Sequence, residues 1–121
     1  MLDVDIKKGD SSDIQILTLS GEFDLFDKER VLELLPQFIS ADSQGLIIDL
    51  TDITLLASAG FEVLILFYEE FRNVGKRVGI VIDHNSYLMR KFRNLGVFEG
   101  TGLEVFETIE EAEAALSGPN P

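Results

Sequence analysis

The chain has 121 residues, of which 22 are acidic and 10 are basic, and its formal net charge is −12. A surface of this charge repels phosphates and anionic lipids, because binding to nucleic acid or to acidic membranes is driven by Lys and Arg. Neither partner is therefore expected. The chain has no cysteine, which excludes disulfides, thiolate nucleophiles and iron–sulfur clusters.

The length predicts one domain over residues 1–116, followed by a flexible tail over residues 117–121 that contains Gly and two Pro residues. The longest apolar run, residues 63–68, is far shorter than the roughly 20 residues that span a bilayer. The N-terminus has no basic leader followed by an apolar segment. We therefore expect a cytoplasmic protein.

The charge is unevenly distributed along the chain. Residues 1–60 carry 12 acids and 4 bases (−8), residues 61–93 carry 4 acids and 6 bases (+2), and residues 94–121 carry 6 acids and no base (−6). The middle of the chain therefore differs in character from both ends.

In chain order, two strands are predicted first, one with alternating Val4 and Ile6 and one over residues 14–19. After Asp24, apolar residues at helical spacing predict a helix that Pro36 breaks, since proline lacks an amide hydrogen and clashes with the preceding turn. The apolar runs 46–48 and 78–82 predict central strands buried on both faces. Between them, residues 58–75 predict an amphipathic helix opened by Ser58.

A further helix is expected after Ser86, ending at Gly96. Its inward face would carry Leu88, Phe92 and Leu95. Its outward face, which is basic and solvated, would carry Arg90, Lys91 and Arg93. Residues 103–106 predict a last strand, and Thr108 with Glu111 matches a capping box that opens a helix to about Leu116. The order β-β-α-β-α-β-α-β-α predicts an α/β domain, a sheet of about five strands with about four helices.

Motifs of enzymatic chemistry are absent from the sequence. It has no phosphate-binding glycine loop, no dinucleotide fingerprint, no zinc-binding His-Glu-x-x-His and no nucleophile elbow. The lone histidine, His84, follows a predicted strand in a turn, and we interpret it as solvent-facing or bonded within its loop. We therefore predict no catalytic residue, no metal site and no cofactor.

A receiver domain is the enzyme-like alternative, with Asp49 as the phosphorylated aspartate at the end of a central strand. That chemistry needs a pair of acids to hold Mg²⁺ and a Lys near the last strand to neutralise the phosphoryl oxygens. No Lys or Arg occurs after Arg93. The sequence therefore disfavours this alternative.

Ser58 is the residue that stands out, because it lies where a helix is predicted to begin. The first amides of a helix have no partner within it, and the helix dipole places partial positive charge there. A phosphate on Ser58 would then be received by the amides of Ala59, Gly60 and Phe61, with Gly60 allowing close approach. The competing interpretation is that Ser58 is simply the N-cap of this helix.

Three stretches resemble a known family. The segment from Leu46 to Leu64, LIIDLTDITLLASAGFEVL, is similar to the signature of STAS domains of the anti-sigma-factor antagonist class. Residues 19–24, LSGEFD, and the region from Leu88 to Ala112 resemble further motifs of that family. The resemblance covers nearly the whole chain.

This resemblance implies a STAS fold, with a mixed sheet and helices packed mainly on one face, and a binding module in place of an enzyme. In that family, the unphosphorylated antagonist binds an anti-sigma factor that is also a serine kinase, and so frees the sigma factor. Phosphorylation ends the complex, and a serine phosphatase reverses it. When the roles of the family's residues are transferred to this sequence, Ser58 is the phosphorylated residue and Asp24 flanks the docking surface. Asp49 ends the strand that leads to the switch loop.

The residues expected to contact the partner lie around Ser58; they are Glu22, Asp24, Ala57, Ala59, Gly60, Glu62 and Leu66. Two positions depart from the family pattern. Ala57 stands where an Asp usually precedes the serine, and Ala59 stands where a second Ser or Thr usually follows it. Ser58 is therefore the only hydroxyl between Thr54 and Tyr68.

An alternative remains open on the same residues. The chain is then a STAS module that is not phosphorylated and serves as an interaction subunit of a transporter or a sensory scaffold, with Ser58 only a helix cap. Ala57 favours this alternative. A weak homodimer is also left open.

Overall fold

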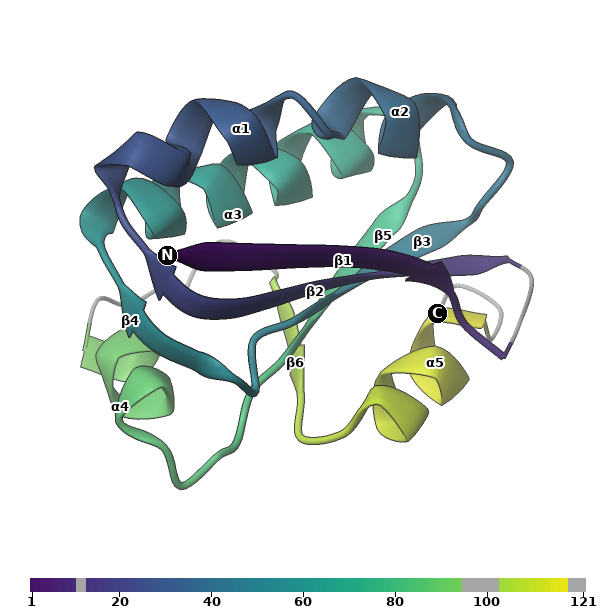
Figure 1. The fold of residues 1–121 in the computed structure, drawn as a ribbon. Coiled ribbons are helices and arrows are strands. Elements are labelled where there is room, and N and C mark those ends of the chain that lie inside the picture. The colour runs from purple at the N-terminus through teal and green to yellow at the C-terminus, as the bar shows by residue number, and fades with distance from the viewer. Residues whose placement is uncertain (11–12, 95–102, 118–121) are drawn as a thin grey trace.

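A computed structural model of the chain describes residues 1–10, 13–94 and 103–117. Its strands and helices are drawn in Figure 1. The strands are β1 (Leu2–Lys8), β2 (Ile14–Phe23), β3 (Gly45–Asp49), β4 (Ile53–Leu56), β5 (Arg77–Val81) and β6 (Glu104–Phe106). The helices are the 3-10 turn η1 (Leu25–Asp27), α1 (Lys28–Leu32), α2 (Leu35–Ser40), α3 (Ser58–Asn73), α4 (Tyr87–Asn94) and α5 (Ile109–Ser117).

The strands form one mixed sheet in the order β1-β2-β3-β5-β6, in which only β1 is antiparallel to its neighbour. Strand β2 is longer than β3, and its final residues pair in parallel with β4, after a register shift between Gly21 and Glu22. The sequence predicted a loop where β4 lies. Its four residues are too few and too unevenly buried to give a clear strand pattern.

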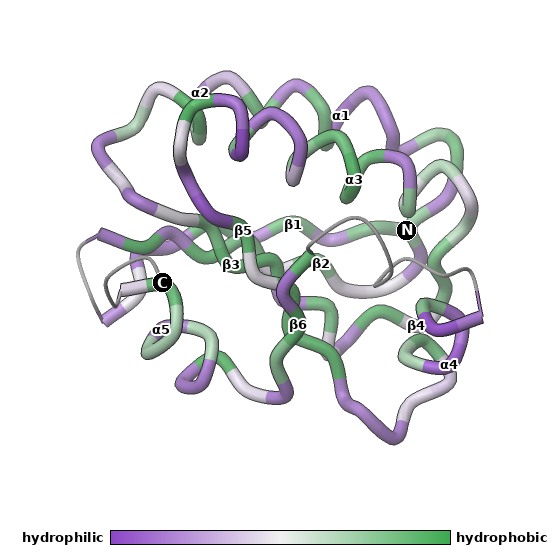
Figure 2. Tube along the Cα trace, turned by 180° about the vertical axis from the view of Figure 1, so that it is seen from behind, coloured by the Kyte–Doolittle hydropathy of each residue, from purple (hydrophilic) through white to green (hydrophobic). Residues whose placement is uncertain are grey.

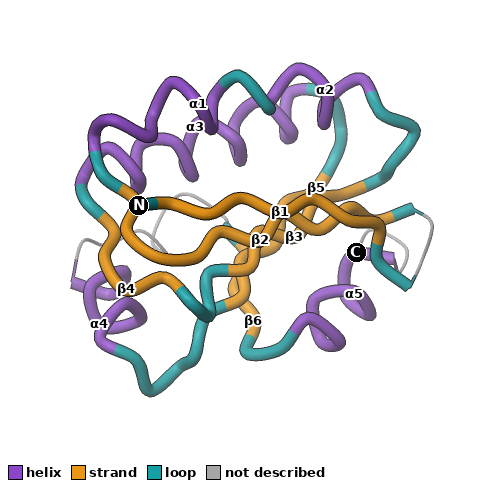
Figure 3. The backbone as a smooth tube through the Cα atoms, in the orientation of Figure 1, coloured by secondary structure: helices purple, strands orange, loops and turns teal. Residues whose placement is uncertain are grey.

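Helices cover the two faces of the sheet unequally. The helices α1, α2 and α3 lie together over one face, and α5 lies under the other (Figures 1 and 3). The larger apolar cluster contains Phe38, Phe67 and Phe71 from the first layer, and a smaller one joins α5 to Ile14, Ile16 and Ile47. The predicted mixed sheet with helices mainly on one face is confirmed, with α5 on the opposite face and α4 beside β4 (Figure 1).

The apolar pattern of the sequence explains this layering. Figure 2 shows apolar residues concentrated in the central strands and in α3. All five residues of β3 are buried, as expected for a strand covered on both faces. The predicted helix break is also confirmed, since α1 ends at Leu32 and Pro36 lies in the first turn of α2, where its missing amide costs nothing.

The C-terminal elements are fixed by polar contacts as well as by packing. Arg77 of β5 donates two hydrogen bonds to the Glu104 carboxylate of β6, at 3.0 and 2.6 Å. These bonds raise the pKa of Arg77 above its ordinary value. The Thr108 hydroxyl accepts from the Glu111 amide, as the capping box predicts, and the Glu111 carboxylate accepts from the amide of Glu107.

The predicted end of the helix that follows Ser86, now α4, falls at Leu95 and Gly96, which lie outside the described residues.

Candidate functional site

Ser58 is exposed at the start of α3, at the end of the sheet where β2 and β4 both finish (Figure 1). It is the first helical residue, and Ala57 is the N-cap. The interpretation of Ser58 as the N-cap is therefore wrong, because Ala57 is the last residue with extended backbone before the helix. In the part of the chain that the structure describes, the Ser58 hydroxyl has no hydrogen-bond partner.

The backbone around Ser58 is held in a fixed position. The Ala57 amide donates to the carbonyl of Phe23 at 2.9 Å, which ties the start of α3 to the end of β2. The Gly60 and Phe61 amides both donate to the Ala57 carbonyl, at 2.9 and 3.3 Å. These two amides, which we expected to receive a phosphate on Ser58, are therefore already bonded. Of the first four amides of α3, those of Ser58 and Ala59 have no acceptor among the described residues.

A lysine from α4 reaches the same end of the sheet. The Lys91 ammonium donates to the carbonyl of Leu56 at 3.2 Å, two residues before Ser58, and lies 5.8 Å from the ring centroid of Phe61. The Phe61 ring in turn packs edge-on against Phe92 of α4, with centroids 4.7 Å apart. The expectation that Lys91 is part of a solvated basic face is wrong, since α4 turns this side chain toward β4 and α3.

Asp24 follows β2 and shapes the turn beside α3. Its carboxylate accepts from the Phe26 amide at 2.9 Å, and its own amide donates to the Asp27 carboxylate at 3.1 Å. This reciprocal capping fixes η1, which packs against α3 and presents Leu25 and Phe26 to solvent. The side chains of Leu25 and Phe26 are 66% and 91% exposed.

The outward stripe of α3 begins at Ser58 and continues through Glu62 and Leu66, at four-residue spacing. All three residues are exposed. The Glu62 carboxylate lies 3.1 Å from the Lys28 ammonium of α1, so its charge is partly neutralised. Glu22 is exposed on β2, beside β4. The structure therefore gathers Glu22, Asp24, Ser58 and Glu62 at one end of the molecule, whereas Leu66 lies on the same outward stripe near the middle of α3.

Ala59 and Gly60 do not lie on this exposed surface. Both are buried, and a Cβ atom on Gly60 would lie 2.4 Å from Cδ1 of Leu56 and 3.2 Å from Cγ of Phe23. The expectation that Gly60 lets a bulky group approach from solvent is therefore wrong, because the missing side chain makes room for the sheet below. Ala57 is half-buried and contributes no side-chain cap.

Asp49 ends β3, as predicted, but its carboxylate is directed into the turn. It is 8% exposed, and one oxygen accepts from both the amide and the hydroxyl of Thr51, at 3.0 and 2.8 Å. This is an Asx turn, which redirects the chain from β3 into β4. A buried aspartate used in this way further disfavours the receiver-domain alternative.

The family model for the STAS domain matches residues 5–112. The chain belongs to the STAS domain family. An anti-sigma factor antagonist from Mycobacterium paratuberculosis is similar in structure, with a TM-score of 0.82, 19% identity, and 98% of this chain and 96% of that chain covered. No curated protein matches the sequence.

Two further solved structures are similar in fold to this STAS domain. The anti-sigma factor antagonist SpoIIAA in its unphosphorylated form gives a TM-score of 0.70 at 17% identity, over 93% of this chain and 96% of that chain. The Bacillus cell fate determinant SpoIIAA in its phosphorylated form gives a TM-score of 0.69 at 20% identity, over 93% of this chain and 98% of that chain. This STAS domain therefore resembles anti-sigma factor antagonists in architecture.

Features outside this end of the STAS domain offer little chemistry. Nδ1 of His84 lies 3.8 Å from a Glu107 carboxylate oxygen, and its Nε2 is buried without a partner among the described residues. The described residues hold no group of three or more His, Asp or Glu side chains that could bind a metal. None of the described helices is long and apolar enough to cross a bilayer.

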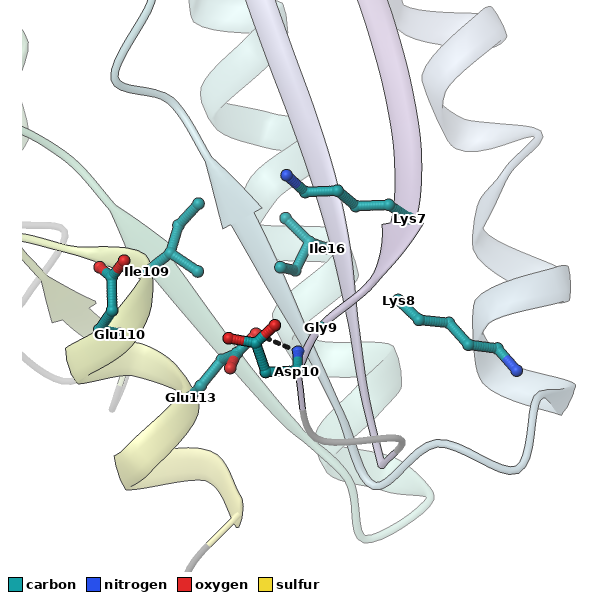
Figure 4. A pocket seen from close by; sticks show the side chains of 8 residues that line it. All are labelled: Lys7, Lys8, Gly9, Asp10, Ile16, Ile109, Glu110 and Glu113. Carbon is teal, nitrogen blue, oxygen red and sulfur yellow. Dashed lines mark hydrogen bonds between the residues drawn. The ribbon is translucent and has the colours of Figure 1, made fainter.

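A shallow pocket of about 280 Å³ lies near the start of β2, whereas Ser58 lies beside its end. Figure 4 shows its side chains, in which Lys7, Lys8 and Asp10 come from the β1–β2 region and Glu110 and Glu113 from α5. Glu113 accepts from the Asp10 amide at 3.1 Å, so part of the pocket is closed by the protein's own contacts. The pocket contains none of the predicted site residues.

Sequence reasoning missed Leu25, Phe26 and Lys91 as parts of this end of the STAS domain. The signal for Leu25 and Phe26 was present, since Asp24 and Asp27 have the spacing of a capping box and enclose two large apolar residues. Lys91 gave no such signal, because only the packing of α4 decides which side chain reaches Leu56.

Proposed function

We propose that this STAS domain protein is an anti-sigma-factor antagonist switched by phosphorylation of Ser58. Its unphosphorylated form binds an anti-sigma factor that is also a serine kinase, and so frees the sigma factor. Phosphate on Ser58 ends this binding, and a serine phosphatase restores it. The protein would thus regulate transcription by exchange of partners, without catalysing a reaction itself.

One observation carries the proposal: Ser58 presents an exposed hydroxyl with no hydrogen-bond partner among the described residues, at the start of α3. A serine that serves only as a cap would bond a nearby amide. This hydroxyl is instead free to enter a kinase active site. It is also the only hydroxyl between Thr54 and Tyr68, so a kinase docked on this part of α3 has one acceptor there.

The surroundings of Ser58 would tolerate a phosphate without unfolding the chain. A phosphoserine adds about −1.5 to −2 charges at neutral pH. The unbonded amides of Ser58 and Ala59, the positive end of the α3 dipole and the Lys91 ammonium near Leu56 all favour negative charge at this place. The phosphate would therefore act on docking and leave the fold intact.

The size of the effect is sufficient for a switch. Like charges brought together at an interface can cost several kcal/mol. A loss of about 3 kcal/mol already lowers an affinity more than a hundredfold. The added bulk on a surface matched to a hydroxyl would act in the same direction.

The test is phosphate transfer in vitro. The protein is incubated with each anti-sigma kinase encoded in the same genome and with ATP, and the phosphorylated residue is mapped by mass spectrometry. We expect transfer to the wild type and to Thr54→Ala, an exposed hydroxyl on β4, and none to Ser58→Ala. Transfer that survives in Ser58→Ala would show that the site is wrong, and no transfer to the wild type would count against the switch itself.

The variant Ser58→Asp tests the consequence of the charge. A carboxylate in the first turn of α3 stabilises the helix by about 0.3–1 kcal/mol. We therefore expect a melting temperature equal to or above that of the wild type, together with at least about a tenfold loss of kinase affinity. Unchanged affinity would contradict the proposed mechanism.

A second function rests on Ala57, the N-cap that contributes no side-chain hydrogen bond. A STAS module without a phosphorylation switch, in a transporter or a sensory scaffold, needs no carboxylate before the serine. Such a module would copurify with membrane components, whereas an antagonist would bind a kinase free of membranes.

A further inference from the structure

The most exposed large apolar residue of a described element is Phe26, at 91%, and Leu25 beside it is 66% exposed. Isolated exposed leucines are ordinary on protein surfaces, but two adjacent large apolar side chains turned wholly to solvent are not. They belong to η1, which contains no buried residue. The turn therefore contributes nothing to the apolar core.

Polar contacts hold this turn in place. The Asp24 carboxylate accepts from the Phe26 amide, the Asp27 carboxylate accepts from the Asp24 amide, and the Asp27 amide donates to the Asp24 carbonyl at 3.1 Å. Asp24, Phe26 and Asp27 therefore share three hydrogen bonds. These bonds fix the turn with Leu25 and Phe26 facing outward. An apolar pair that is held rigid loses little conformational entropy when a partner encloses it.

The pair also lies beside the proposed switch. The turn η1 packs against α3, and the first residue after it, Lys28, forms an ion pair with Glu62, one turn along α3 from Ser58. The start of α1 and the start of α3 lie at the same end of the sheet in Figures 1 and 3. A partner that reaches the Ser58 hydroxyl would therefore pass over Leu25 and Phe26.

The charge around the pair defines the partner. Glu22 and Glu29 are exposed on either side of η1 in the sequence, and neither has an ion-pair partner among the described residues. The two basic residues that follow the turn, Lys28 and Arg30, are already paired with Glu62 and Asp27. A surface that accepts Phe26 must therefore offer an apolar pocket bordered by Lys or Arg. Where the same partner meets Ser58 it must be neutral or acidic, because the proposed switch depends on repulsion of the phosphate.

We propose that Leu25 and Phe26 form the apolar anchor by which this protein docks its serine kinase, inserted into an apolar pocket with a basic rim. This inference rests on the proposed function, since the occupant is the kinase that phosphorylates Ser58. Phe26 supplies the buried centre of the interface, and Glu22 and Glu29 supply its charged border. Enclosed aromatic side chains at the centre of an interface are the usual carriers of affinity.

The test compares Phe26→Ser, Phe26→Leu and Val74→Ser for binding to the purified kinase that phosphorylates wild-type Ser58, by calorimetry. Val74 is a matched control, since it is 50% exposed at the opposite end of α3. We expect Phe26→Ser to bind at least about tenfold more weakly, Phe26→Leu to retain most of the affinity, and Val74→Ser to bind as the wild type does. All three should melt at the wild-type temperature.

Three further measurements separate an anchor from other roles. Phosphate transfer to Ser58 in Phe26→Ser should show a raised KM with kcat nearly unchanged, because the acceptor hydroxyl is intact. Glu22→Gln combined with Glu29→Gln should slow association and weaken its dependence on salt. Sedimentation of the wild type alone tests a second copy of the chain as the occupant.

The outcomes are distinguishable. If the kinase phosphorylates Ser58 and Phe26→Ser binds it as tightly as the wild type, the anchor is wrong while the switch stands. If the wild type forms a dimer that Phe26→Ser abolishes, and kinase binding is unchanged, the occupant is a second copy and the proposal is overturned. If no kinase binds or phosphorylates the wild type, the proposed function fails and the anchor fails with it.

Discussion

Gly60 shows how closely the start of α3 packs against the sheet. A Cβ atom at this position would lie 2.4 Å from Cδ1 of Leu56 and 3.1 Å from its Cγ. Leu56 is fully buried, so its side chain has little room to move. The glycine therefore sets the depth at which Ser58 and its neighbours sit above β4.

We predict that Gly60→Ala destabilises the protein by about 1 kcal/mol. Overpacking costs about 1–3 kcal/mol, and the better helix propensity of alanine offsets up to about 1 kcal/mol of that cost. Urea unfolding measures the difference.

The matched control for Gly60→Ala is a double-mutant cycle with Leu56→Ala. In that background the new methyl group enters the space that leucine leaves, so Gly60→Ala should be neutral or stabilising. Equal destabilisation in both backgrounds would mean that Leu56 is not the source of the cost.

The turn η1 is the element that links the fold to the proposed interface. It connects the end of β2 to α1, and its geometry depends on Asp24 and Asp27 and on no buried side chain. Asp24 was expected to flank the docking surface. The hydrogen bonds of its carboxylate and amide make it a positioning residue for Leu25 and Phe26.

We predict that Asp24→Ala and Asp24→Asn separate these two roles. Alanine removes the cap and should cost about 1 kcal/mol of stability, together with several-fold of kinase affinity, because η1 loosens. Asparagine caps as well as aspartate does, so Asp24→Asn should keep both stability and affinity. Urea unfolding and calorimetric binding measure the two quantities, and a loss of affinity in Asp24→Asn equal to that in Asp24→Ala would assign the role to charge.

The charge of the whole molecule is the background against which a single phosphate must act. The formal charge is −12, but the structure partly neutralises the acids near Ser58, since Glu62 pairs with Lys28 and Lys91 approaches from α4. The local field at the switch is therefore less negative than the net charge suggests. On the proposed function, a phosphate there would be compatible with the fold, and its repulsion would act on the docking partner.

We predict that salt weakens this discrimination. The ratio of kinase affinities between Ser58→Asn and Ser58→Asp, which differ in charge and hardly in size, should fall when ionic strength rises from about 0.01 to about 1 M, because the screening length shortens from about 30 to about 3 Å. Titrations at both ionic strengths measure it. A ratio independent of salt would show that bulk, and not charge, operates the switch.

Much of the fold was predictable because its elements have strong local patterns. The continuous apolar run of β3, the helical spacing in α3 and the break at Pro36 each follow from side-chain periodicity or proline chemistry, and each is confirmed. Strand β4 was not predictable, because its ladder partner, the end of β2, is about thirty residues away and its own pattern is short. Ser58 could be singled out from its place before an apolar helix, although its exact helical position could not.

The sequence by itself determined the α/β class, the charge and the position of a serine at a helix start, because these depend on composition and local periodicity. Only the tertiary structure decided which side chains surround that serine. The burial of Ala59 and Gly60, the outward direction of Leu25 and Phe26 and the reach of Lys91 to Leu56 all depend on how α3, η1 and α4 pack at one end of the sheet. Contacts between segments distant in sequence leave no periodic signal, and so they are settled only when the chain is folded.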